Sequence, residues 1–132
     1  MTQQIPIIDT HAHFYDFSHP ELKWVWLDPD FVHPILGNIN AIKARQYVVE
    51  DYRAESRFAG VDGVVHVQAA IGSPNPVTET VWLTEMNKKS PIPIRIVADS
   101  PLGNPGAIAQ LEQHAQSKLF VGVRDFNAEP LL

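Results

Sequence analysis

The order of strand-like and helix-like segments is the feature that most constrains the fold of this chain. Four short apolar runs, at residues 5–9, 63–69, 92–98 and 120–124, have the composition of buried strands. A long loop and a helical segment separate the first two runs, and a helical segment lies in each later interval. Because strands that alternate with helices are joined by right-handed crossovers, the sequence predicts an α/β fold with about four parallel strands.

Glycine, asparagine and proline mark where the expected helices begin and end. Gly60 stands where a helix-ending glycine belongs, and Asn-Pro pairs at 75–76 and 104–105 predict two helix starts. Apolar residues at helical spacing predict the faces that turn toward the sheet. These residues are Val48, Val49, Tyr52 and Ala59 in the first helix, Val77, Val81 and Met86 in the second, and Ile108, Leu111 and Ala115 in the third.

Composition narrows the classes of function. The 132 residues are 45% hydrophobic and 19% charged, which predicts one globular domain over 1–132. A net charge of −5 without a basic block argues against nucleic-acid binding, and the lack of cysteine excludes disulfides and thiolate metal sites. Residues 1–4 do not resemble a secretory signal, and no apolar stretch is long enough to span a bilayer. We therefore expect a soluble, cytoplasmic protein without membrane or nucleic-acid partners.

The long aromatic loop at residues 14–44 interrupts the regular alternation. It contains Trp24, Trp26 and Phe31 together with three prolines. Loops of this length within a domain are usually functional lids or binding loops. The alternative is an irregular packed layer in which both tryptophans are simply buried.

Two histidines follow the first apolar run, in the sequence Asp9-Thr10-His11-Ala12-His13. Side chains two residues apart in a strand point to the same side, so both imidazoles can reach one target. A metal ion and a polarised carbonyl group are the two candidates. Asp9 shares this face, where it would either orient an imidazole or cap a nearby amide.

Other polar residues fall on or after the later strands. His66 and Gln68 share one face of the second strand, with Gln68 nearer the expected site and His66 expected to be a hydrogen-bonded core residue. Arg124 would either clamp a substrate carboxylate or pair with an acid such as Asp99 or Asp125. Either acid is also a possible base, although caps and loop acids are commoner.

The remaining histidines receive no role from the sequence. His19, His33 and His114 are expected in loops or on a helix surface.

Three segments together resemble the amidohydrolase superfamily, specifically its amidohydrolase-related, lactonase-like branch. They are Ile-Ile-Asp-Thr-His-Ala-His-Phe at 7–14, Gly-Val-Val-His-Val-Gln-Ala-Ala at 63–70 and Val-Gly-Val-Arg at 121–124. The likeness extends over essentially the whole chain and includes the tryptophan-bearing loop.

This resemblance implies a (β/α)8 barrel with its active site at the C-terminal ends of the strands. Such barrels have about 250 residues, so we expect a partial barrel equivalent to the first half. The family's further histidines and its late aspartate base have no counterpart in the sequence. The resemblance implies that His11, His13 and Arg124 are catalytic, with Gln68, Trp26 and Arg124 also binding a small-molecule substrate. It leaves open whether His11 and His13 hold a divalent metal such as zinc or act without one.

Three functions follow as alternatives. The first is a hydrolase in which water attacks the carbonyl of a lactone or similar cyclic ester or amide. The second is a catalytically silent barrel fragment that associates with itself through exposed strand edges. The third is a metal-dependent decarboxylase of the same superfamily branch.

Overall fold

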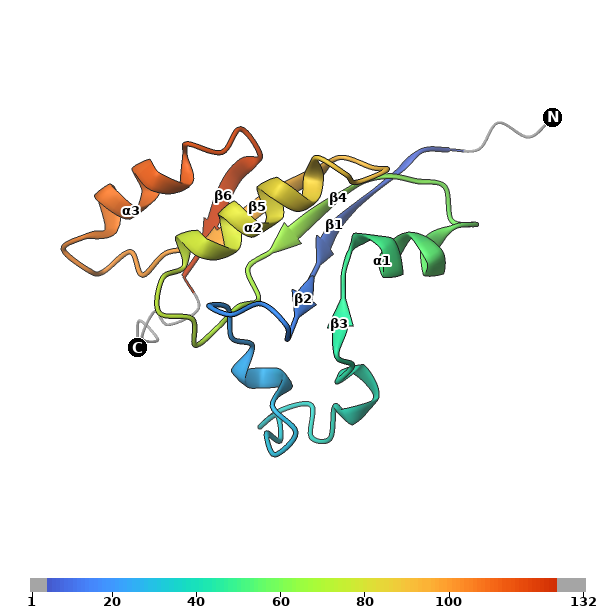
Figure 1. Ribbon diagram of the computed structural model, residues 1–132, viewed down its shortest axis with the longest axis horizontal. Coiled ribbons are helices and arrows are strands. Elements are labelled where there is room, and N and C mark those ends of the chain that lie inside the picture. Colours follow the sequence, from blue (N-terminus) through green and yellow to red (C-terminus); the bar gives the residue numbers. More distant parts are fainter. Residues whose placement is uncertain (1–4, 126–132) are drawn as a thin grey trace.

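The computed structural model describes residues 5–125, and its centre is a four-stranded parallel sheet (Figure 1). The strands are β1 (Ile7–Ala12), β4 (Val61–Val67), β5 (Ile94–Asp99) and β6 (Phe120–Arg124), paired in that order. All three pairings are parallel. The α/β fold and the parallel sheet expected from the sequence are therefore confirmed.

Three helices connect these strands: α1 (Val49–Ser56), α2 (Val77–Asn87) and α3 (Ala107–His114). Gly60 has a φ of +69°, the left-handed conformation that favours glycine, but it stands four residues beyond the end of α1 at Ser56. The side-chain oxygen of Asn75 accepts a hydrogen bond from the amide of Val77 at 3.0 Å, which caps the first turn of α2. The helix start expected at 75–76 is therefore confirmed, whereas the first helix ends before the expected stop at Gly60.

The predicted apolar faces of α2 and α3 are partly wrong. Val81 is 56% exposed and Ile108 is 73% exposed, although both were expected to face the sheet. The buried residues are instead Glu79, Thr80 and Leu83 in α2, and Ala107 and His114 in α3. Buried polar side chains with specific partners, at positions outside the apolar pattern, therefore form part of the inward faces of these helices.

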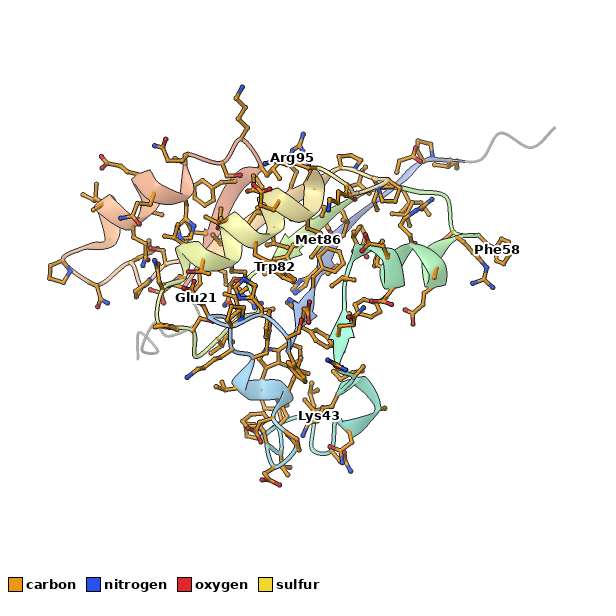
Figure 2. All side chains as sticks on the ribbon, in the orientation of Figure 1. Glu21, Lys43, Phe58, Trp82, Met86 and Arg95 are labelled. Atoms are coloured by element: carbon orange, nitrogen blue, oxygen red, sulfur yellow. The ribbon has the colours of Figure 1, made fainter. Side chains whose placement is uncertain are left out.

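The aromatic segment at 14–44 packs as a layer against the carboxyl ends of the strands. It contains β2 (Tyr15–Asp16), η1 (Val25–Leu27) and η2 (Asn40–Ile42), and β2 pairs with β3 (Gln46–Tyr47). Four of its buried residues, Tyr15, Leu22, Trp24 and Leu27, form a second hydrophobic cluster together with Ala69 and Ala70. Trp82 on α2 contacts both this cluster and the main core (Figure 2). The burial of Trp24 therefore fits a packed layer, whereas Trp26 remains half-buried.

The main core lies between the sheet and its helices, around Phe14, Val64, Leu83, Ile94 and Ile96. The two edge strands of the sheet are β1 and β6. The edge strands carry exposed apolar side chains, with Ile8 57% exposed and Val121 58% exposed. Within residues 5–125, no helix is long and apolar enough to cross a bilayer.

Candidate functional site

The rings of His11 and His13 converge at the carboxyl end of β1. Their Nε2 atoms lie 3.2 Å apart, and the rings meet edge to face. The Nδ1 of His13 lies 2.8 Å from the carbonyl oxygen of Val67. Because a carbonyl only accepts, this contact places the proton of a neutral His13 on Nδ1 and leaves Nε2 with a lone pair. In the metal-free protein, His11 Nε2–H is then the donor in the contact between the rings.

His13 is held in its neutral form. Burial lowers the pKa of His13 to about 4, and the bond to Val67 opposes this only in part. Electrostatic interactions with His66, His11 and Arg124 lower the pKa of His13 further. At neutral pH Nε2 of His13 therefore carries a lone pair, which accepts the hydrogen bond from His11.

The spacing of the two Nε2 atoms matches a pair of zinc ligands. Nitrogens bound to one tetrahedral zinc at about 2.05 Å lie about 3.3 Å apart. Catalytic zinc usually has three protein ligands, and among residues 5–125 no group of three histidine, cysteine, aspartate or glutamate side chains is arranged to hold a metal. The described residues therefore fit a metal as two of its ligands.

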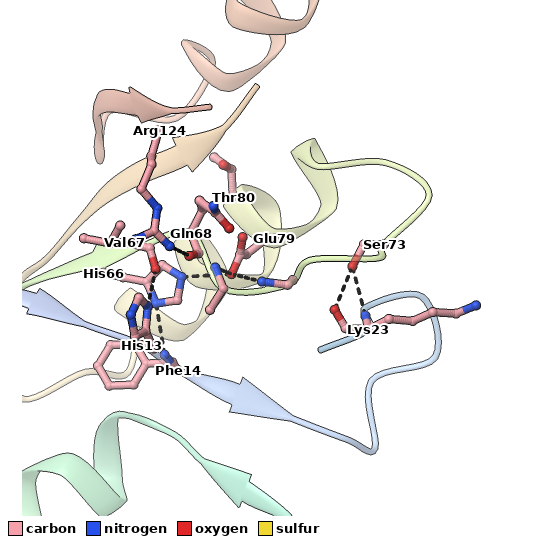
Figure 3. A network of polar contacts seen from close by, with 12 residues as sticks. His13, Phe14, Lys23, His66, Val67, Gln68, Ser73, Glu79, Thr80 and Arg124 are labelled. Atoms are coloured by element: carbon pink, nitrogen blue, oxygen red, sulfur yellow. Dashed lines mark hydrogen bonds and ion pairs between the residues drawn. The ribbon is translucent and has the colours of Figure 1, made fainter. Parts of the chain in front are cut away.

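Three successive backbone carbonyls at the end of β4 hold three of the predicted site residues. Val67 O accepts from His13, Gln68 O accepts from Arg124 Nη2 at 2.8 Å, and Ala69 O accepts from Trp26 Nε1 at 2.7 Å. Figure 3 shows the first two of these contacts. Side chains from β1, β6 and the aromatic segment thus meet on one short stretch of backbone.

Arg124 and Asp99 lie opposite each other on β6 and β5. Burial lowers the pKa of Arg124, while the carboxylates of Glu79 and Asp99 oppose that shift. Burial, followed by the charges of Glu79 and Asp125, raises the pKa of Asp99. A cation and an acid with perturbed pKa values therefore stand at this edge of the sheet.

Gln68 is completely buried at the end of β4. Neither its side-chain oxygen nor its nitrogen has a hydrogen-bond partner among the described residues. The structure therefore brings Gln68 to the site but gives its side-chain amide no direct access from solvent.

Asp9 caps a backbone amide rather than orienting an imidazole. Its Oδ1 accepts from the backbone N–H of His11 at 3.0 Å, and its Oδ2 accepts from Tyr52 OH at 2.8 Å. Burial, followed by this bond to Asp9, raises the pKa of Tyr52 to about 12. Of the two alternatives for Asp9, the structure supports the amide cap.

His66 is a fully buried core histidine, as expected, and its partner Glu79 was not anticipated. The Nδ1 of His66 accepts from the amide of Phe14 at 3.1 Å, and its Nε2 lies 2.9 Å from Glu79 Oε1. Glu79 stands in the first turn of α2 and is 3% exposed. An acid in a first helical turn is common, so the sequence alone gave no signal of its burial.

The surface position expected for His114 is wrong. This side chain is fully buried between Thr80, whose hydroxyl lies 2.8 Å from its Nδ1, and Asp99, whose carbonyl accepts from its Nε2 at 3.0 Å. His19 and His33 do lie in loops, where each Nδ1 accepts from nearby backbone amides.

Comparison with known proteins gives one informative match. The chain is 31% identical over 121 residues to an uncharacterized protein, y4mH, of Sinorhizobium fredii. This stretch covers 91% of the chain and 39% of the relative, so the chain spans well under half of that protein's length. No family model matches the chain, and no solved structure matches it.

Proposed function

We propose that this chain forms the first half of an amidohydrolase-related (β/α)8 barrel and carries one wall of a hydrolytic site for a lactone or similar cyclic ester or amide. The observation that carries the proposal is the convergence of His11 and His13 Nε2 at 3.2 Å, at the carboxyl end of a parallel strand. Active sites of such barrels lie at that end of the strands.

The sheet topology supports the barrel. The parallel strands follow one another in chain order with a helix between successive strands, which is the arrangement that closes into a (β/α)8 barrel. The 121 matched residues make up 39% of the relative. The relative is therefore long enough for a barrel of about 250 residues.

The polar groups suit water attack on a carbonyl. His11 can donate Nε2–H to the carbonyl oxygen, while the Nε2 lone pair of His13 accepts a proton from the attacking water. Arg124, held against Gln68 O, is placed to bind a carboxylate or hydroxyl group of the substrate. A divalent metal bound by His11 and His13 would polarise the carbonyl as a Lewis acid.

Hydrolysis of simple δ-lactones by the purified chain tests this proposal. We expect His13→Ala to lower kcat/KM by about 100-fold or more, since general acid–base groups contribute at least that much. His33→Ala is the control, because His33 is a half-buried histidine whose Nδ1 accepts from the amide of Ile35 within the aromatic segment. Equal rates for His13→Ala and the wild type would refute the proposal. Undiminished lactone hydrolysis by the wild-type chain after metal removal would exclude the alternative of a metal-dependent decarboxylase.

Self-association is a second candidate function, favoured by the exposed edge strand β1. Ile7 and Ile8 on that strand are 45% and 57% exposed. Unpaired strand edges are templates for pairing with another chain. Sedimentation of the wild type and of Ile8→Lys tests this candidate. A dimer that dissociates in the variant supports the candidate, and a wild-type monomer excludes it.

A further inference from the structure

We infer that Glu79 is a positioning residue for the site around His13, acting through the end of β4. The inference deepens the proposed function and rests on it, because the groups that Glu79 organises are those of the proposed site. Nothing in the sequence or the resemblance gives Glu79 a role.

One oxygen of Glu79 gathers three donors. Oε1 accepts from the amides of Ala69 at 2.9 Å and Ala70 at 3.0 Å, and from His66 Nε2 at 2.9 Å (Figure 3). A carboxylate that is 3% exposed is stable in the interior only with such compensation. These bonds fix the turn that follows β4 to the first turn of α2.

The two amides held by Glu79 belong to the peptide groups that hold Arg124 and Trp26. The peptide group between Gln68 and Ala69 gives its N–H to Glu79 and its carbonyl oxygen to Arg124. The next peptide group gives the N–H of Ala70 to Glu79 and the carbonyl oxygen of Ala69 to Trp26. Because hydrogen bonds at the two ends of a peptide group polarise each other, Glu79 strengthens both contacts as well as orienting them.

His66 links Glu79 to the backbone of His13 through two hydrogen bonds. Since His66 donates Nε2–H to Glu79, its Nδ1 is the acceptor for the amide of Phe14. That amide belongs to the peptide group joining His13 to Phe14. The backbone of His13 is therefore fixed from Glu79 through His66, while its ring is fixed by the carbonyl of Val67 in the same strand. Glu79 is thus linked through hydrogen bonds of the backbone and His66 to His13, Arg124 and Trp26.

The test uses the full chain without metal and three variants. Glu79→Gln keeps the shape and replaces a charged acceptor with a neutral one, while Glu79→Ala removes the acceptor. Glu85→Gln is the control, because Glu85 lies on the exposed side of the same helix with its side chain 63% exposed. Two quantities are measured by NMR: the hydrogen exchange of the Ala69 and Ala70 amides, and the ¹⁵N shifts of the His13 ring, which report its tautomer.

We expect the two amides to exchange at least about fivefold faster in Glu79→Gln, since hydrogen bonds to charged groups are about twice as strong as neutral ones. We also expect the His13 ring to lose part of its Nδ1–H population in that variant, and more of it in Glu79→Ala if this variant folds. Glu85→Gln should change neither quantity. Loss of stability alone does not alter the tautomer of the folded protein, so the ring shifts separate positioning from a merely structural role.

Two outcomes in Glu79→Gln would overturn the inference: amide exchange at the wild-type rate, or faster exchange with unchanged His13 ring shifts. Failure of the proposed function is distinguishable from both, since it appears as absent lactone hydrolysis by the wild type, whatever the ring shifts show.

Discussion

Trp26 donates its indole N–H to the carbonyl oxygen of Ala69 at 2.7 Å, which joins the aromatic segment to the end of β4. The Trp26 ring also meets the His13 ring edge to face, with centroids 5.9 Å apart. The long segment between β1 and α1 is therefore anchored where the candidate site residues gather.

The hydrogen bond between Trp26 and Ala69 should contribute measurably to the free energy of unfolding. Trp26→Phe retains most of the ring but removes the donor, and should lower the free energy of unfolding by about 1 kcal/mol. Trp82→Phe is the control for lost ring area, because Trp82 is also half-buried and lies on α2. Urea denaturation measures both. A Trp26→Phe variant no less stable than the wild type would show that the bond contributes nothing.

Thr80 and His114 form a second buried contact that predicts a stability loss. The Thr80 hydroxyl lies 2.8 Å from Nδ1 of His114, which donates its other ring N–H to Asp99 O. Thr80→Val keeps the shape of the side chain but leaves Nδ1 buried without its donor, which should cost about 1–3 kcal/mol. Thr78→Val on the same helix should cost less than about 0.5 kcal/mol. Equal free energies of unfolding for the two variants would contradict this assignment.

The lowered pKa of His13 predicts a loss of stability in acid. Burial lowers the pKa to about 4 in the folded protein, against about 6.5 in the unfolded chain. Between these values the unfolded chain binds more protons, so its population grows as pH falls from about 6.5 to about 4. Burial also lowers the pKa of His114, which adds a change of the same sign.

Urea denaturation at about pH 7 and about pH 4.5 measures this effect. His13→Gln cannot titrate at this position, so its free energy of unfolding should fall less than that of the wild type over the same range. Since His11, His66 and Arg124 interact electrostatically with His13, His33→Gln serves as a matched control outside that group. Equal falls in the wild type and His13→Gln would contradict the pKa assignment.

The elements that could be predicted from the sequence are those set by local chemistry. A run of β-branched residues such as Val64 and Val65 favours a strand wherever it lies, and Asn75 caps the first turn of α2 through local geometry. The convergence of His11 and His13 was predictable too, because it depends on strand periodicity over three residues.

The features that were not predictable depend on partners far along the chain. Glu79 is buried because His66 and two amides satisfy it, and His114 is buried because Thr80, 34 residues earlier, faces it. An apolar pattern treats a glutamate or histidine on a helix as exposed, since burial of such a group without a partner is costly. With Glu79 and Thr80 of α2 and His114 of α3 buried, Val81 and Ile108 on the same helices are exposed.

The most direct test of the account is titration of the chain with zinc, followed by the ¹⁵N signals of the histidine rings. The account predicts that the Nε2 signals of His11 and His13 shift together as one weak site fills, while Nδ1 of His13 keeps its proton against Val67 O. His13→Ala should abolish the shift of His11, and His33→Ala should leave it unchanged. Zinc that binds equally well to His13→Ala, or that leaves both rings unchanged in the wild type, would contradict the convergence of His11 and His13 on one metal ion.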